Sequence, residues 1–132
     1  MTSKNTNATL TLTTVSRVDD VQKNTFTYPA HFYRKKDTYY VTFEGEELNI
    51  ITIKQNEVRL SKPHSNTTLC FEQGFEHVSN YMTPAGKMSV SVFTHKLLNM
   101  FHDERRIFIK YRLDFGGSMI TENDITIKIQ EN

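Results

Sequence analysis

The stretch Ile125-Thr126-Ile127-Lys128-Ile129 alternates apolar and polar side chains with a period of two. That period places successive side chains on opposite faces of a pleated β-strand. The same alternation recurs along most of the chain, for example in Thr9–Thr13, Tyr39–Phe43 and Ile51–Lys54. The sequence therefore predicts an all-β protein whose strands each have two unlike faces.

Turn-forming residues divide the chain into about ten predicted strands. The strongest turn signal is Thr83-Pro84-Ala85-Gly86, because proline presets φ at the second turn position and glycine is favoured at the fourth. Gln55-Asn56 predicts a tight hairpin, since asparagine tolerates positive φ. The predicted strands span residues 9–18, 23–34, 38–44, 48–54, 57–62, 67–72, 75–82, 87–95, 105–113 and 119–130.

Two stretches are less regular. Pro29 lies inside the second predicted strand and cannot donate to a ladder, so it predicts a sheet edge, a bulge or a break. Lys96–Phe101 fits either a continued strand or one helical turn, and His102-Asp103-Glu104 is predicted to be a charged loop. Alternation in the second strand places four apolar or aromatic residues on one face: Phe26, Tyr28, Ala30 and Phe32.

Short connections favour an up-and-down meander, and a meander of eight to ten strands tends to close into a barrel that has no exposed edges. A sandwich would show the same alternation, so periodicity alone does not separate the two architectures. We predict a single antiparallel up-and-down β-barrel over residues 9–132, preceded by a flexible tail of residues 1–8. A length of 132 residues fits one domain.

Composition narrows the classes of partner. Sixteen basic and fifteen acidic residues give a net charge of +1, which offers no global reason to bind nucleic acid or an anionic membrane. Cys70 is the single cysteine, which excludes an intramolecular disulfide and fits a reducing compartment. No signal peptide is visible, and no apolar run approaches the ~20 residues of a membrane helix. We therefore expect a cytoplasmic protein without a nucleic-acid or membrane partner.

No motif predicts catalytic chemistry. A nucleophile elbow and a phosphate-binding loop are both absent from the sequence. The histidines do not follow a metal-ligand spacing; they are His31, His64, His77, His95 and His102. We accordingly predict no catalytic residue, metal or cofactor, and an enzyme is the less favoured interpretation.

Two stretches resemble the patterns of a known family. His31–Glu44, which reads HFYRKKDTYYVTFE, resembles L-Y-x-K … Y-Y-L-x-Y-E-E, and Phe71–Gly74 followed by Tyr81–Gly86 resembles F-x-x-G … Y-x-T-P-x-G. Over nearly its whole length the chain is similar to the YwiB-like domains of Gram-positive bacteria, a family without an assigned function. The resemblance implies a lipocalin-like (calycin-type) barrel in a small cytoplasmic protein, and it implies no activity.

The sequence departs from that family pattern at two positions. Gly45 stands where a second glutamate is common, which weakens a paired-carboxylate role for Glu44. Lys62 stands where an arginine is expected. Lysine keeps the charge but lacks the planar fork that binds carboxylate or phosphate with two hydrogen bonds.

A ligand site inside the barrel is the first functional hypothesis. Phe75, His77, Ser79 and Tyr81 share one face, and if that face lines the barrel, its histidine and tyrosine are polar groups in an apolar cavity. On the opposite register both are surface residues, and a small barrel is often simply filled by side chains. For a small, partly apolar ligand the candidate binding residues are Tyr81, His77, Phe71, Tyr111, Phe43 and Lys62.

Two alternatives remain open at this point. One is an acid/base enzyme that uses His77 and Tyr81 in the barrel interior. The other is an interaction module or homodimer that uses an outer sheet face carrying Tyr33 or Phe108.

Overall fold

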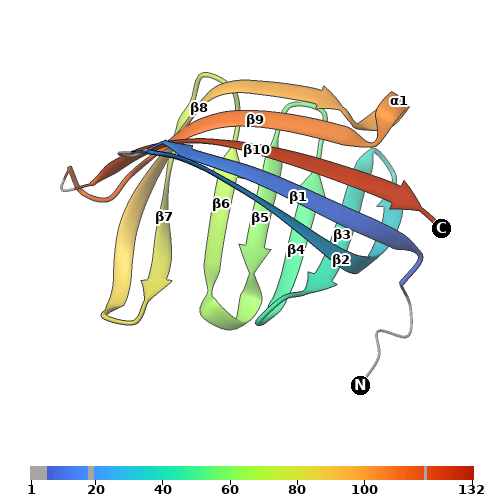
Figure 1. Cartoon of the computed structure of the whole chain (residues 1–132), viewed down its shortest axis with the longest axis horizontal. Helices are drawn as coiled ribbons and strands as arrows, with labels where there is room; N and C mark the ends of the chain where they lie inside the picture. Colours follow the sequence, from blue (N-terminus) through green and yellow to red (C-terminus); the bar gives the residue numbers. More distant parts are fainter. Residues whose placement is uncertain (1–5, 18–19, 118) are drawn as a thin grey trace.

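The computed structural model describes residues 6–17, 20–117 and 119–132, which form ten antiparallel strands in one sheet that curls into a nearly closed barrel (Figure 1). The predicted all-β class and the antiparallel up-and-down barrel are therefore confirmed. The strands are β1 (Ala8–Arg17), β2 (Val21–Lys35), β3 (Thr38–Glu44), β4 (Leu48–Ile53), β5 (Val58–Lys62), β6 (Thr67–Phe71), β7 (Glu76–Thr83), β8 (Gly86–Met100), β9 (Arg106–Asp114) and β10 (Ile120–Glu131).

The strands follow chain order around the barrel. Ladders join each consecutive pair from β1 to β6 and from β7 to β10. The first and last strands are neighbours inside the sheet, because β1 pairs with β10 from Ala8↔Glu131 to Arg17↔Glu122. In the described part of the chain no ladder joins β6 to β7, and an isolated bridge between Gln73 and Thr94 lies beside them. The seam of the barrel therefore falls in the middle of the chain.

The alternation seen in the sequence sorts side chains between the barrel interior and the solvent. In β10, Ile125, Ile127 and Ile129 are buried, whereas Thr126 between them is half-buried and Lys128 is exposed. The same register brings inward-facing side chains of neighbouring strands together, as with Leu10 opposite Ile129. The core is made from aliphatic and aromatic residues of nine of the ten strands, and none of its described members lies in β7.

A plug of three aromatic rings and one arginine closes one end of the barrel. The helical turn α1 (Phe101–Glu104) inserts Phe101, which is fully buried, against Phe32 and Tyr39 with ring centres 5.6 and 4.9 Å away. The Arg105 guanidinium lies over these rings, 5.1 Å from the centres of Phe32 and Tyr39 and 5.5 Å from that of Phe101. Figure 1 shows α1 at this end, beside the C-terminal end of β10.

The plug corrects one prediction and resolves another. The loop expected at His102–Glu104 is helical, because burial of Phe101 ties the turn into the core. The ambiguous segment Lys96–Phe101 continues β8 as far as Met100, after a register shift between Thr94 and Lys96. Such a bulge changes which side chains face inward, so the alternation breaks at that point.

The opposite end of the barrel is open on the β2 side. Only Ala30–Lys35 of β2 pair with β3, so the preceding half of the strand, Val21–Pro29, pairs with β1 alone. Pro29 lies where the ladder to β3 stops, so of the three predicted alternatives (an edge, a bulge or a break) the structure shows a sheet edge. The overhanging half of β2 forms one wall of the open mouth.

The last two residues of the predicted tail, Asn7 and Ala8, are part of the barrel. Asn7 bonds to β2 through both side-chain atoms, accepting from the Phe32 amide at 2.7 Å and donating to the Phe32 carbonyl at 2.8 Å. Ala8 is buried in β1. Residues 1–5 of the predicted tail lie outside the described residues.

Candidate functional site

A cavity of about 430 Å³ occupies the open mouth of the barrel. Its deep wall is the apolar inner face of strands on both sides of the barrel, which brings together residues far apart in sequence. The aliphatic part of this lining is Leu12, Leu60, Leu69, Leu113 and Ile125. We call this space the mouth cavity.

Four aromatic rings line the mouth cavity: Phe26 and Tyr28 from β2, Phe43 from β3 and Tyr111 from β9. Tyr28 lies between the other two rings of its wall, 4.8 Å from Phe43 and 6.5 Å from Phe26 between ring centres. Tyr111 stands on the opposite wall, where its ring meets Phe71 edge-on at 4.8 Å. A flat apolar ligand entering the mouth would meet aromatic rings from β2 and β3 on one side and from β9 on another.

Polar groups gather at the rim of the mouth cavity. They come from the turn between β3 and β4, from the start of β4 and from the ends of β5 and β6: Glu46, Glu47, Asn49, Lys62 and Thr67. Glu47 is held in place because its Oε2 accepts from the Ser65 hydroxyl at 2.6 Å and its carbonyl accepts from the Asn49 side-chain amide at 2.9 Å. Its other oxygen, Oε1, is buried and has no hydrogen-bond partner among the described residues.

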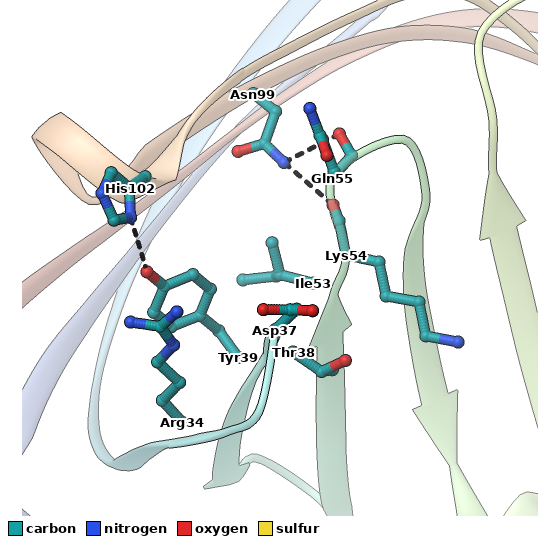
Figure 2. A pocket seen from close by; sticks show the side chains of 9 residues that line it. All are labelled: Arg34, Asp37, Thr38, Tyr39, Ile53, Lys54, Gln55, Asn99 and His102. Atoms are coloured by element: carbon teal, nitrogen blue, oxygen red, sulfur yellow. Dashed lines mark hydrogen bonds between the residues drawn. The ribbon is translucent and has the colours of Figure 1, made fainter.

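A second cavity of about 550 Å³ lies at the plugged end (Figure 2). The Tyr39 hydroxyl and Nδ1 of His102 are 3.0 Å apart, and the Asn99 side-chain amide donates to the carbonyls of Lys54 and Gln55 at 2.9 and 3.2 Å. The guanidinium of Arg34 lies over the Tyr39 ring, 5.5 Å from its centre. Figure 2 shows His102 from α1 facing Tyr39 of β3, and Asn99 from β8 facing the backbone of the turn between β4 and β5.

These contacts hold the plugged end together, and they engage four of the polar side chains that line this cavity: Arg34, Tyr39, Asn99 and His102. The cavity lies on the outer side of the aromatic plug, and its lining includes exposed turn residues such as Asp37 and Gln55. The mouth cavity, in contrast, reaches the apolar interior. We therefore regard the mouth cavity as the candidate functional site.

Comparison with known proteins places the chain in a family. A family model described as "Domain of unknown function (DUF1934)" matches residues 10–127. The chain belongs to this family. A solved structure, "Crystal structure of ywiB protein from Bacillus subtilis", matches with a TM-score of 0.82 at 18% sequence identity, over 96% of this chain and 92% of that chain. At this identity the likeness shows the fold alone. A comparison with curated proteins gave no match.

The DUF1934 fold brings together three of the six predicted site residues. Phe43, Lys62 and Tyr111 all line the mouth cavity. Phe71 is buried behind Tyr111 rather than exposed in the cavity, and it acts as packing for that ring.

The remaining two predicted site residues lie on β7. In the β7–β8 ladder, His77 lies opposite Val92, which faces inward. The His77 side chain is nevertheless half-exposed, and its Nε2 atom lies 3.0 Å from Oε1 of Glu72. His77 does not line the mouth cavity. The backbone of Tyr81 pairs with Met88, and its side chain lies outside the described residues.

Several lining residues of this DUF1934 member were not predicted as site residues. Phe26 and Tyr28 share the apolar face that was predicted for the second strand with Ala30 and Phe32, so register could have identified them. Asn49 lies in β4 on the same face as the buried Ile51 and Ile53, so register could have identified it as well. Glu46 and Glu47 lie on the turn between β3 and β4. Alternation gives no direction for side chains on a turn, so no sequence signal placed these two at the mouth.

In residues 6–17, 20–117 and 119–132 no three His, Cys, Asp or Glu side chains are grouped closely enough to hold a metal ion. Over the same ranges no helix has the length and apolar character needed to cross a membrane.

Proposed function

We propose that the protein binds a small, partly apolar ligand in the mouth cavity and does not catalyse a reaction on it. The observation that carries this proposal is the combination of an apolar deep wall, aromatic rings on two sides and a polar rim in one cavity. Ligand sites of roughly 300–1,000 Å³ commonly combine an apolar lining with a few polar groups that orient the ligand. The volume of about 430 Å³ lies within that range.

The barrel architecture supports the proposal physically. The plug built from Phe101 and Arg105 closes one end, so an apolar ligand would be shielded from water on every side except the mouth. Burying apolar surface contributes about 25 cal/mol per Å² of binding free energy before the cost of association is subtracted. We place this activity in the cytoplasm, where a reducing environment keeps the free Cys70 thiol intact.

A pair of matched substitutions tests the location of the site. Thr14 is half-buried and lines the mouth cavity, and Thr38 is half-buried and lines the cavity at the plugged end. The neutral fluorescent probe N-phenyl-1-naphthylamine is titrated into the wild-type protein, Thr14→Trp and Thr38→Trp. We expect Thr14→Trp to weaken probe binding by at least about tenfold, because the indole fills the mouth, and Thr38→Trp to leave it within about twofold.

Backbone chemical-shift changes provide an independent readout if Thr14→Trp does not fold. In the wild-type protein, binding of the probe should change the NMR chemical shifts of backbone amides around Phe43, Leu60 and Tyr111. The proposal is wrong if the protein does not bind the probe, or if the shifts and the loss of binding both map to the plugged end around Tyr39.

A further inference from the structure

The rim of the mouth cavity has an excess of negative charge. Two carboxylates and one ammonium group line it: Glu46, Glu47 and Lys62. None of the ion pairs between described residues includes any of these three side chains. A cleft lined mainly by one sign of charge attracts ligands of the opposite sign.

Glu47 has an acceptor that no described protein group uses. Ser65 satisfies Oε2, whereas Oε1 is buried without a partner. A buried acceptor without a donor is unfavourable, and ionised carboxylates readily accept several hydrogen bonds. The terminal torsion of a glutamate is soft, so rotation of the carboxylate can present an oxygen to a donor in the cavity. A ligand that carries N–H or other positively polarised groups would satisfy this oxygen.

The carboxylates stand beside the aromatic wall of the same cavity. A Cβ atom built at Gly45 would lie 3.9 Å from both the Cε1 atom and the hydroxyl oxygen of Tyr28, so the turn that carries Glu46 and Glu47 lies against that ring. Tyr28 in turn contacts Phe43, with ring centres 4.8 Å apart. Cations are attracted to the faces of aromatic rings, and the attraction strengthens where water is excluded.

These observations point to one class of ligand. We propose that the mouth cavity binds an organic cation, that is, an ammonium group attached to an apolar chain or ring. The charged group lies between the aromatic wall at Tyr28 and the carboxylates of Glu46 and Glu47, and the apolar body extends toward Leu113. This inference rests on the proposed function, because it requires the mouth cavity to be the ligand site. Lys62 on the same rim would instead favour an anion, and the experiment separates the two.

Three probes with the same eight-carbon chain test the sign of the charge. Octyltrimethylammonium, octanol and octanoate are each used below their micelle concentration to displace N-phenyl-1-naphthylamine from the full chain. We expect the cation to bind about tenfold or more tightly than the anion, which is the size of effect that one cation–π or charge-assisted contact produces. Raising the salt concentration should narrow this preference. Octylamine in place of octyltrimethylammonium shows whether a hydrogen-bonding head group binds better than a methylated one.

Neutral variants identify the groups responsible. Glu46→Gln and Glu47→Gln combined should reduce the preference for the cation to about twofold or less, whereas Lys62→Gln should increase it. Glu44→Gln is the matched control, because Glu44 is exposed at the end of β3 and does not line the mouth cavity. It should leave the preference unchanged.

The outcomes separate this inference from the function on which it rests. If octanoate binds more tightly than octyltrimethylammonium, or if the double glutamine variant keeps the full preference, the ligand is not selected as a cation and ligand binding at the mouth still stands. If none of the three probes displaces N-phenyl-1-naphthylamine that is bound at the mouth, the inference fails, whereas the proposed function fails only if N-phenyl-1-naphthylamine itself does not bind there.

Discussion

Arg105 shows how one residue closes the plugged end of the barrel. Its backbone has φ of 55°, in the left-handed region, and its amide donates to the Phe101 carbonyl at 3.0 Å to end α1. Left-handed backbone is unfavourable for a residue with a Cβ atom. The side chain offsets this cost, because the guanidinium covers the aromatic plug, donates to the Phe101 carbonyl at 2.9 Å and pairs with Glu131 at 3.1 Å.

Replacing Arg105 should therefore destabilise the whole barrel. We expect Arg105→Ala to lower the free energy of unfolding by about 2–4 kcal/mol, through lost cation–π contacts and hydrogen bonds. Arg105→Gly should be about 0.5–1 kcal/mol more stable than Arg105→Ala, since glycine adopts the left-handed backbone without strain. Urea unfolding measures both values. Arg106→Ala serves as the control, because its pair with Glu104 is exposed and should contribute no more than about 0.5 kcal/mol. Equal stability of Arg105→Ala and Arg106→Ala would contradict this role.

Cys70 should make stability depend on pH in the alkaline range. Burial raises the pKa of its thiol above the ordinary value of 9.0, and the nearby Glu57 carboxylate adds to the effect. Below pH 9 both folded and unfolded thiols are protonated, so this contribution is fully present. As pH rises above 9 the unfolded state loses its proton first, so it binds fewer protons than the folded state and stability falls until the folded thiol also ionises.

A variant isolates this effect from other groups that titrate at high pH. The unfolding free energy of the wild-type protein minus that of Cys70→Ala should be constant from pH 7 to about 8.5 and should then decrease steadily up to pH 10.5. Urea unfolding of both proteins at each pH provides the difference. A difference that stays flat, or that increases with pH, would show that the thiol is not protected from ionisation in the folded protein.

At the residue scale the sequence predicted only part of the candidate site. Phe43 and Tyr111 could be placed because they lie in regular strands, where a period of two decides which face each side chain occupies. Glu46 and Glu47 could not, since they lie on a turn whose direction depends on how β3 and β4 pack. His77 shows a further limit of this reasoning. It pairs with Val92, whose side chain faces inward, but the His77 side chain contacts Glu72 instead.

At the scale of elements, the boundary between β6 and β7 is the least strongly bonded part of the barrel. Each has a ladder on one side only among the described residues, whereas β1, β9 and β10 have ladders on both sides. The connection between β6 and β7 is held by the Gly74 amide, which donates to the Thr94 carbonyl at 2.8 Å, and by the pair between His77 and Glu72. A strand bonded on one side opens locally more easily than one bonded on both.

Amide hydrogen exchange should show that β7 opens more readily than β10. We expect amides of β7 between residues 76 and 80 to exchange at least about tenfold faster than those of β10 between residues 125 and 129, under conditions where the barrel stays folded. Amides in β1 around Leu10 provide an internal reference, because they should be as slow as those of β10. Equal protection of β7 and β10 would mean that the seam is as stable as the ladders.

The sequence predicted the elements more completely than their ends. Ten strands were expected and ten are found in the described residues, because turn residues and alternation are local signals. Helix α1 was missed, since a helix of four residues is too short to show a helical period and forms because Phe101 packs into the plug. The bulge after Thr94 could not be foreseen, because it depends on how β8 meets β9 rather than on the residues of β8 alone.

At the scale of the whole molecule, the order of strands in the sheet is a circular shift of their order in the chain. The sheet order starts at β7, continues through β10 to β1 and ends at β6. The pairing of β1 with β10 therefore requires the two ends of the chain to meet. Pairing between distant parts of a chain slows folding, because the intervening loop must be closed before contacts form.

A circular permutant removes that requirement. Asn132 donates from its amide to the Asn7 carbonyl at 3.0 Å, so a short linker can join Asn132 to Thr6. New ends between Gln73 and Gly74 fall at the seam, where no ladder between described strands is interrupted. In this permutant every ladder joins strands that are consecutive in the chain. We expect it to keep the barrel and to refold about tenfold faster than the original order, measured by stopped-flow dilution from urea.

A second permutant shows whether connectivity is the cause. It carries the same linker, but its new ends lie between Lys36 and Asp37 in the turn between β2 and β3. This variant also makes the β1–β10 ladder local, but it turns the ladder from Ala30↔Phe43 to Lys35↔Thr38 into a pairing between its two ends. One long-range ladder thus replaces another, and its refolding rate should stay within about threefold of the original. The seam permutant could instead refold more slowly than the original, or not fold. That result would mean that the covalent link between β6 and β7 is needed to nucleate the barrel, so strand order alone would not set the folding rate of the protein.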